Sequence, residues 1–451
     1  MTALRFATFL ASLLLAQAAC RPVDQPARTS PPVVVIGVDG MDPRVVQALL
    51  AAGRLPNLAR FATEGTLGRL RTMNPTLSPV LWTSIATGVR PEQHGIVDFQ
   101  DGSGRPFTSN ARRAPALWDI LSQRERTVNC VGWWVTWPAE PVNGNMVASY
   151  AAQAQASVVW KPGTWEQLPD QTWPKDLVER TRPLMIFASD AEEIRSRLWE
   201  RFPPPRTLDD ITRDSVTILG WTFAADLSFA AITADLMQRD AADLNMVYLA
   251  LPDVAGHRFW SCFRPQDFLA EVPAQKREDF GDYVNLAYAE ADRLIGELLA
   301  AAPVGANVLL LSDHGMGPFD QALSNPEQPV SGHHDGSVAG IIGAMGPSIR
   351  RGGNLLGRRR ELGGILDVAP TVLRLLEEPA PSHWPKVQNG LELSRLLEPE
   401  WSKEHPLETS TSDDAWFREA TSSITPGNGL NRKFISSFRS LGYTLSDPEE
   451  D

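Results

Sequence analysis

Three acidic residues, Asp39, Asp253 and Asp313, each follow an apolar stretch that is typical of a buried strand. The clearest stretch is residues 33–38, an unbroken run of apolar or small residues with prolines before it and Asp39-Gly40 after it. Such a run indicates a strand buried on both faces of a parallel sheet, and ligands bind beyond the carboxyl ends of such strands. An isolated Asp-Gly pair is explained equally well by a turn, so the other motifs must decide what Asp39 does.

Four of the seven histidines of the chain lie in or near these motifs. They are His257, four residues after Asp253, His314, directly after Asp313, and the pair His333 and His334 on a predicted loop further along. Each motif alone is better explained as a cap, a turn or a core histidine. Together, at strand ends on one face of a sheet, they are hard to explain by structure alone. Carboxylates and imidazoles bind zinc in hydrolytic sites, and six of them suffice for two metal ions.

Ser78 is a candidate nucleophile at the start of a predicted helix. Ser78-Pro79 is a helix-start pair, in which serine caps the helix and proline occupies its first turn, and Gly88 is a suitable C-terminal stop. A helix N-terminus also binds anions, and a metal-bound serine hydroxyl ionises more readily than a free one. Capping and nucleophilic attack compete for the same oxygen, and Thr76 is the second candidate nucleophile.

The composition is that of a globular protein. Of 451 residues, 43% are hydrophobic and 21% are charged, which favours one large α/β domain with an inserted or second subdomain. The net charge of −12, without a Lys/Arg-rich block, argues against a nucleic-acid partner. A phosphate-type substrate would then need local positive charge, most simply from bound metal. We expect Cys130 and Cys262 to be free buried thiols, with one bridge between them as the alternative.

The first twenty residues predict a signal peptide. Arg5 precedes an apolar run that is too short to span a membrane, and small residues follow it up to Cys20. The segment resembles a bacterial lipoprotein signal, in which Cys20 would be lipidated, although Gln17 occupies a position that usually carries leucine. Residues 21–32 then form a linker rich in Pro, Arg and Ser. We therefore predict an exported protein, either periplasmic or anchored to the membrane through Cys20.

The remaining pattern predicts a doubly wound, mostly parallel α/β sheet flanked by helices, over residues 33–400. Expected strands are 33–38, 67–73, 127–135, 244–250, 307–311 and 338–344, and expected helices include 43–52, 56–64, 116–121, 282–301 and 367–376. Between residues 148 and 241 the alternation stops and helical patterns follow at 190–202 and 208–238, which indicates an inserted, mainly helical lid subdomain. Residues 401–451 read as a polar C-terminal extension with a short helix at 433–441.

The order of these motifs resembles that of the alkaline phosphatase superfamily. The resemblance rests on Val38-Asp39-Gly40, on Pro75-Thr76-Leu77-Ser78-Pro79 with Thr87-Gly88 and Pro91-Glu92-Gln93-His94-Gly95-Ile96, on Pro252-Asp253 with Gly256-His257, on Ser312-Asp313-His314-Gly315-Met316, on Gly332 with His334, and on Asp367-Val368-Ala369-Pro370. It is strongest to the type I phosphodiesterase/nucleotide pyrophosphatase branch and its uncharacterised bacterial relatives. It covers roughly residues 33–376, without the insertion.

The resemblance implies a site for two divalent metal ions, with zinc expected and manganese as the alternative. One ion would be held by Asp253, His257 and His334, and the other by Asp39, Asp313 and His314. His333 is the alternative to His334. Ser78 matches the nucleophile of the family and would contact the second metal ion, and His94 would brace the loop after its helix.

Two departures bear on specificity. The nucleotide pyrophosphatase branch has a threonine nucleophile and an asparagine three residues later, where this chain has Ser78 and Leu81. A sulfatase is disfavoured because the sequence after Ser78 lacks the Xaa-Pro-Xaa-Arg pattern. We expect a metal-dependent phosphodiesterase or phosphatase that forms a serine phosphoryl-enzyme and acts on a small phosphate ester or a lipid or nucleotide head group. The alternatives are a phosphomutase or phosphoryl/head-group transferase, and a surface-anchored, metal-stabilised binding protein without catalysis. Nothing in the sequence fixes the oligomeric state.

Overall fold

The structure is a computed structural model that describes residues 30–102, 106–152, 169–187, 191–322, 324–325, 329–334, 338–358, 360–382, 384 and 393–410. The predicted signal peptide, Cys20, most of the linker and the predicted helix at 433–441 lie outside these residues. Export and lipidation therefore stay predictions.

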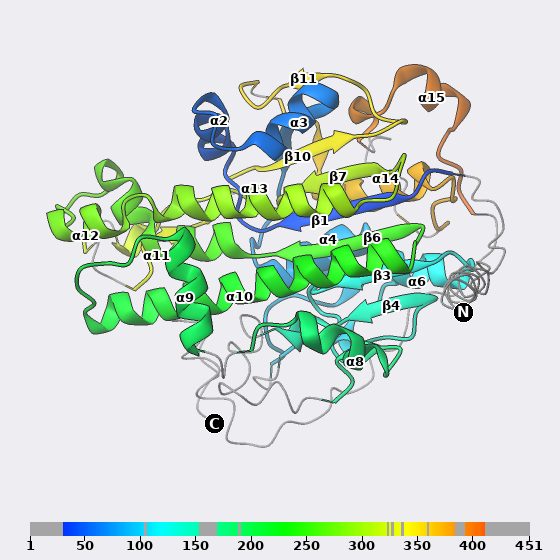
Figure 1. Ribbon diagram of the computed structural model, residues 1–451. Coiled ribbons are helices and arrows are strands. Elements are labelled where there is room, and N and C mark those ends of the chain that lie inside the picture. The colour runs from blue at the N-terminus through cyan, green and yellow to red at the C-terminus, as the bar shows by residue number, and fades with distance from the viewer. Residues whose placement is uncertain are drawn as a thin grey trace, which may run out of the picture.

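A large, mostly parallel sheet forms the centre of the molecule (Figure 1). Its strand order is β11-β2-β10-β7-β1-β6-β3-β4-β5, and β12 also pairs with β2. The strands are β1 (Val33–Val38), β2 (Thr66–Arg71), β3 (Val128–Val131), β4 (Gly144–Val147), β5 (Thr172–Trp173), β6 (Leu244–Leu249), β7 (Asn307–Leu311), β10 (Gly340–Met345), β11 (Gly353–Asn354) and β12 (Gly363–Gly364). The central strand β1 pairs in parallel with both β6 and β7, whereas β10 runs antiparallel to β7 and β2.

Helices cover both faces of this sheet. Alternate side chains of β1 enter two separate apolar cores, Val33 and Val35 in one and Val34, Ile36 and Val38 in the other. The first core contains α4 (Ser78–Thr87), α6 (Leu117–Gln123) and α14 (Val368–Leu375). The second contains α2 (Pro43–Ala51), α3 (Pro56–Glu64), α10 (Asp210–Arg239), α11 (Leu251–Phe263) and α13 (Tyr283–Ala301). The predicted doubly wound α/β architecture is confirmed.

The region 148–241 is helical in much of its described part, but its longest helix is not a lid. The lid prediction is wrong for α10, because this helix packs against β6, β3, α11 and α13. It is long and apolar enough to cross a membrane, yet 78% of its most apolar window is buried inside the protein, as expected for a core helix. The remaining described elements of the region are β5, α8 (Leu177–Thr181), α9 (Ala191–Arg201) and the 3-10 turns η3 (Ser149–Ala151) and η5 (Arg182–Leu184). For these a role as a lid stays a prediction.

The other described elements are short. They are α5 (Pro91–His94), α12 (Ala274–Phe280), α15 (Pro399–Glu404), the hairpin of β8 (Gly317–Pro318) and β9 (Gly332–His333), and several 3-10 turns that include η10 (Ser394–Leu396). Cys130 and Cys262 are both buried free thiols, as predicted.

Candidate metal centre and active site

Two of the predicted ligand groups lie at the carboxyl ends of neighbouring parallel strands. Asp39 directly follows β1, and Asp313 and His314 follow β7 after one intervening serine. All three side chains are fully buried. The hydroxyl of Ser312 joins the two loops, because it accepts a hydrogen bond from the Met41 N–H (2.8 Å) and donates one to the His314 carbonyl (2.9 Å).

The third acid does not lie at a strand end. The predicted strand stops at Leu249, and Asp253 lies in the first turn of α11. His257 is one helical turn further on, so both side chains project from the same face of that helix. The carboxylate of Asp226, on α10, accepts hydrogen bonds from the backbone N–H groups of Ala250 and Leu251 at 2.9 Å each. This buried acid therefore caps the start of the helix that carries Asp253 and His257.

Two glycines allow these segments to approach each other. Gly40 has a φ of +72°, and a Cβ atom there would lie 2.6 Å from the Asp253 Cα. A Cβ atom on Gly332 would lie 2.2 Å from the carbonyl oxygen of Gly256. Larger residues would push α11 away from Asp39 on one side and from the His333-His334 segment on the other.

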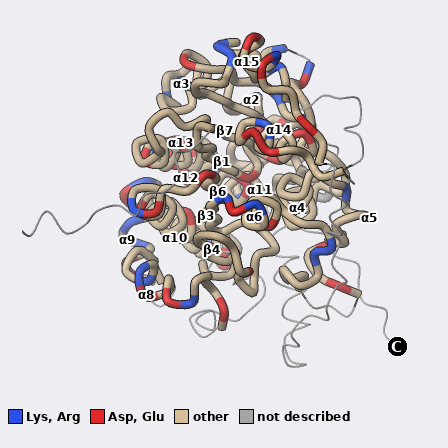
Figure 2. Tube along the Cα trace, turned by 90° about the vertical axis from the view of Figure 1, so that its right-hand side faces the viewer, with Lys and Arg blue, Asp and Glu red and all other residues tan. Residues whose placement is uncertain are grey.

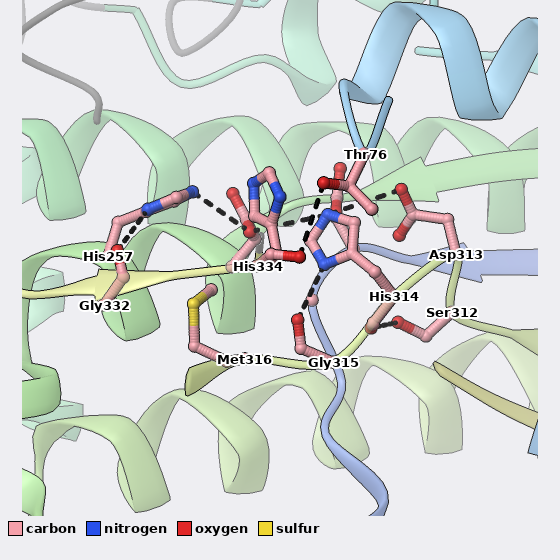
Figure 3. Close-up of polar contacts among 12 residues, drawn as sticks. Thr76, His257, Ser312, Asp313, His314, Gly315, Met316, Gly332 and His334 are labelled. Carbon is pink, nitrogen blue, oxygen red and sulfur yellow. Dashed lines mark hydrogen bonds and ion pairs between the residues drawn. The ribbon is translucent and has the colours of Figure 1, made fainter. Parts of the chain in front are cut away.

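Backbone carbonyls orient two of the histidines. Nδ1 of His257 lies 2.8 Å from the Gly332 carbonyl oxygen, and Nδ1 of His314 lies 2.9 Å from the Gly315 carbonyl oxygen (Figure 3). A carbonyl only accepts hydrogen bonds, so Nδ1 must carry the proton in both rings. The Nε2 atoms are left to face the centre of the cluster, which is the usual arrangement around metal-binding histidines.

The six predicted ligand residues gather in one place, and their atoms form two overlapping groups. Asp253, His257 and His334 form one group with potential ligand atoms within 4.8 Å of one another, and Asp39, Asp253 and His314 form another. Oδ1 of Asp253 lies 3.5 Å from Nε2 of His257 and 4.0 Å from Nε2 of His314, so this carboxylate lies between the groups. Asp313 is beside the second group, 3.5 Å from Nε2 of His314.

His334, rather than His333, occupies the centre. The His334 ring lies 4.0 Å from the His314 ring and 5.0 Å from the His257 ring, measured between centroids. The His333 ring stacks on Phe319 at 4.8 Å and is 5.7 Å from the His257 ring. The geometry therefore favours His334 as the ligand.

The chemistry of the cluster suits metal ions. Several buried atoms have no hydrogen-bond partner: Oδ1 of Asp39, Oδ1 of Asp253, both carboxylate oxygens of Asp313 and Nε2 of His314. Buried polar atoms are normally paired, and acids this close repel each other unless positive charge lies between them. The residues present fit divalent cations with carboxylate and imidazole ligands.

The charges of the cluster shift the pKa of its members in opposite directions. Burial disfavours protonation of His314, but the carboxylates of Asp313, Asp39 and Asp253 outweigh it and raise its pKa to about 10. Burial and the Asp39 charge raise the pKa of Asp253 and of Asp313 well above the usual range. The site thus favours a positive charge among these carboxylates, whether it is a proton or a metal ion.

Ser78 is the first residue of α4, and its neighbours on both sides contact the cluster. Leu77 has the extended backbone of a capping residue and its carbonyl accepts the first helical hydrogen bonds, so Ser78 is the first helical residue and not the predicted cap. Two residues earlier, the Thr76 hydroxyl donates to the His334 carbonyl at 3.3 Å (Figure 3). One turn later, the Trp82 indole N–H donates to Oδ2 of Asp39 at 3.0 Å. The start of α4 is therefore tied to both halves of the cluster.

The sequence analysis missed three residues that support the site: Trp82, Tyr248 and Asp226. The Tyr248 hydroxyl donates to Oδ2 of Asp39 at 2.6 Å. Burial by itself raises the pKa of Asp39, but His314 and the Tyr248 hydroxyl outweigh it and lower that pKa to about 2. A tyrosine inside a mostly apolar strand, and a tryptophan one helical turn after Ser78, were the available signals.

His94 braces the loop after α4, as predicted. Its Nε2 lies 2.9 Å from the Ser84 hydroxyl on α4, and its Nδ1 accepts a hydrogen bond from the Ile96 N–H at 3.1 Å. His94 is not among the residues of the metal cluster.

A match to a known protein family supports this description. The sequence matches the family "Type I phosphodiesterase / nucleotide pyrophosphatase" over residues 33–333. No match was found among proteins of curated function. Among solved structures, the fold is similar to that of a 2-O GAG sulfatase, BT1596, with 13% sequence identity, a TM-score of 0.49, and coverage of 80% of this chain and 74% of the sulfatase chain. The match to the family extends over well more than half of the chain, and the protein belongs to the type I phosphodiesterase/nucleotide pyrophosphatase family of the alkaline phosphatase superfamily.

Proposed function

We propose that this hydrolytic enzyme cleaves phosphate esters at a site for two divalent metal ions, with Ser78 as the nucleophile. The main support is the position of Ser78 between Thr76, which contacts the His334 backbone, and Trp82, which contacts Asp39. Residues four apart on a helix share a face, so Ser78 shares the face of α4 that Trp82 turns towards Asp39.

Asp253, His257 and His334 would hold one metal ion, and Asp39, Asp313 and His314 the other, with Asp253 close enough to serve both. When bound, such ions act as Lewis acids that neutralise charge on the phosphoryl oxygens and make a hydroxyl or water a stronger nucleophile. Zinc is the first choice for this ligand set and manganese the second.

The protein's own groups then define two displacements. In the first, Oγ of Ser78 forms a bond to phosphorus, the bond from phosphorus to the ester oxygen breaks, and the alcohol leaves with a proton. In the second, a water oxygen bonds to phosphorus, the Ser78 Oγ–P bond breaks, one proton of the water returns to Oγ, and phosphate or a phosphomonoester is released. The N-terminus of α4 directs the positive end of its dipole at the phosphoryl group in both steps.

The residue at position 81 does not favour diesters over monoesters. Leu81, where the family branch has an asparagine, is fully buried in the apolar core of that face of the sheet. It offers no hydrogen bond to a phosphate oxygen, so recognition by that amide is lost. We therefore propose a phosphodiesterase or phosphatase, without committing to nucleotide diesters.

The test compares p-nitrophenyl phosphate with bis-p-nitrophenyl phosphate, each with zinc or manganese. Ser78→Ala should reduce turnover at least a thousandfold, while metal content stays near two ions per chain. Thr76→Val is the matched control, because it removes a neighbouring hydroxyl, and it should keep most activity. Full activity in Ser78→Ala, or loss only in Thr76→Val, would reject Ser78 as the nucleophile.

Product analysis separates the rival activities. A transferase would pass the phosphoryl group to an added alcohol such as glycerol in preference to water, whereas a hydrolase releases mainly phosphate. A binding protein without catalysis would hydrolyse neither substrate with either metal ion.

A further inference from the structure

A pocket lined by arginines lies at the outer edge of the sheet, beside β2. Its volume is about 380 Å³, within the range of small-molecule sites. Its walls include Arg350, Arg358, Arg360 and Arg395 together with Thr66 and Gly352. In Figure 2 several basic segments lie near α15, which follows Arg395 in the chain.

The sequence prediction that no Lys/Arg-rich block exists is wrong for this stretch. Residues 350–360 contain five arginines, in two groups separated by six uncharged residues. The spacing dilutes the charge along the sequence, and the overall charge of −12 hides it. In the fold Arg350, Arg358 and Arg360 line one pocket, and the chain between them pairs with β2 as β11.

Backbone hydrogen bonds hold the arginine-bearing chain in place on β2. The Gly353 N–H donates to the Gly65 carbonyl at 3.0 Å, and the Leu355 N–H donates to the Leu67 carbonyl at 2.7 Å. After the outward turn, the Leu362 N–H donates to the Arg69 carbonyl at 2.9 Å. The segment that carries Arg358 and Arg360 is thus anchored at both ends.

The other two arginines are fixed in the same way. The Arg350 N–H donates to the Leu396 carbonyl at 2.8 Å, which joins this chain to η10 next to Arg395. The Thr66 hydroxyl donates to the Arg350 carbonyl at 2.6 Å and accepts from the Gly352 N–H at 2.9 Å. Three separate parts of the chain therefore contribute arginines to the walls of one pocket.

Carboxylates do not neutralise these arginines in the part of the chain that the structure describes. Arg395 donates to the backbone carbonyl of Glu361 at 3.4 Å, and no described acid forms an ion pair with any of the four. Elsewhere on the surface arginines are paired, as Arg54 is with Asp282. Positive groups gathered in a pocket without acidic partners repel each other, and a multivalent oxyanion would relieve that repulsion.

The pocket is separate from the metal centre. β2 is antiparallel to β10, which is antiparallel to β7, so β2 runs parallel to β7 and β1. Thr66 is the first residue of β2. This wall of the pocket therefore lies at the amino-terminal ends of these strands, opposite the carboxyl ends that hold Asp39 and Asp313. An anion bound there would not touch the catalytic groups.

We propose that this arginine pocket binds a multivalent phosphate-type anion, independently of the catalytic site. Guanidinium groups suit this ligand because each can donate two parallel hydrogen bonds to phosphate oxygens. The phosphate could belong to a free polyphosphate or to an anionic lipid head group.

Tripolyphosphate is the probe for the free anion, titrated calorimetrically into the metal-loaded protein at low and high salt. Arg358→Ala/Arg360→Ala should weaken binding at the pocket at least tenfold and reduce its salt dependence, with hydrolysis of the p-nitrophenyl substrates unchanged. Arg197→Ala/Arg213→Ala is the matched control: it removes the same charge from two exposed arginines that pair with Glu193 and Asp210, and it should leave binding as in the wild type.

Vesicles identify the source of the phosphate. The full chain with Cys20→Ser, which excludes lipidation, is sedimented with phosphatidylglycerol or phosphatidylcholine vesicles. If the Arg358→Ala/Arg360→Ala variant loses binding to phosphatidylglycerol vesicles but not to tripolyphosphate, the ligand is a lipid head group. If it loses binding to tripolyphosphate but not to the vesicles, the ligand is a free anion. The proposal is overturned if the arginine pair and the control pair behave alike with both probes, since any anion binding would then belong to the metal centre or to general charge.

Discussion

The Trp82 indole N–H and the Asp39 carboxylate are joined by a hydrogen bond of 3.0 Å inside the protein. This bond links α4, which begins with the proposed nucleophile, to the end of β1, which carries a proposed metal ligand. The Trp82 ring also packs on β1, since a Cβ atom at Gly37 would lie 2.4 Å from it. One side chain thus connects α4 both to β1 and to the Asp39 carboxylate.

Trp82→Phe should therefore affect catalysis more than stability. The substitution removes a hydrogen bond to a buried carboxylate, worth about 2 kcal/mol of unfolding free energy, and frees the start of α4 to shift. We expect kcat to fall about tenfold or more with a smaller change in KM. Trp133→Phe is the control, because the Trp133 N–H donates to the Trp82 carbonyl at 2.9 Å and not to a ligand. Similar kcat losses in both variants would show that Trp82 acts only through packing.

Asp226 should control metal retention although it is not itself a ligand. Asp226→Ala leaves the N–H groups of Ala250 and Leu251 at the start of α11 without their acceptor, at a cost of about 1–3 kcal/mol for the buried Leu251 group and less for the part-buried Ala250 group. The helix start should loosen and the affinity of the site containing Asp253 and His257 should fall, measured as metal content after dialysis. Asp226→Asn keeps one acceptor oxygen and should therefore retain part of the metal affinity that Asp226→Ala loses.

Asp235 provides the comparison for Asp226 on the same helix. It pairs with Arg180 and Arg239 near the surface, and Asp235→Ala should leave metal content unchanged. Equal metal loss in the two alanine variants would mean that general weakening of α10 is responsible.

Residues that lie next to each other in the sequence could be assigned to the site in advance. Asp313 and His314 follow one buried strand after a single serine, and Asp39 directly follows another, so local pattern alone places them at one edge of a parallel sheet. Asp253 was also assigned correctly to the cluster, but it was expected at the end of a strand. It lies instead in the first turn of a helix, which Pro252 marks.

Long-range contacts escaped the sequence analysis because no local pattern encodes them. Tyr248 reaches Asp39 across 209 positions of sequence, through the parallel pairing of β6 with β1. The helix α10 was mistaken for part of a lid because the alternation of strands and helices stops before it. Its burial against β6 and α13 depends on strand order, which sequence periodicity does not specify.

His94 should make the protein sensitive to acid. Burial first, and then the charge of Arg112, lower its pKa from 6.5 to about 3. Between these values the unfolded chain binds a proton that the folded protein excludes, so stability falls as the pH drops below 6.5. The loss attributable to His94 should be about 2 kcal/mol at pH 5. Urea unfolding of wild type and His94→Gln at pH 7 and pH 5 measures it.

His94→Gln should have a lower free energy of unfolding than wild type at pH 7. Between pH 7 and pH 5 that free energy should fall less in the variant than in wild type. Ser84→Ala removes the side-chain partner of His94 and leaves the titrating ring in place. It should lower stability at both pH values and keep the steep pH dependence. Parallel curves for wild type and His94→Gln would exclude His94 as the source of acid sensitivity.

Asp313→Asn should have opposite effects on stability with and without metal. Burial and the Asp39 charge raise the pKa of Asp313, so at neutral pH its ionisation costs stability whenever no metal ion offsets it. In chelator the variant should therefore melt at a higher temperature than wild type. In zinc the order should reverse, because wild type gains about 4 kcal/mol from an ion present at a thousand times its Kd and the variant has lost a ligand.

Asp210→Asn, which removes the same charge from a side chain that is 98% exposed, should change neither melting temperature. If zinc stabilises Asp313→Asn as much as wild type, Asp313 is not a ligand. If the variant is the less stable one in chelator as well, the Asp313 carboxylate does not carry the electrostatic cost that its burial near Asp39 implies.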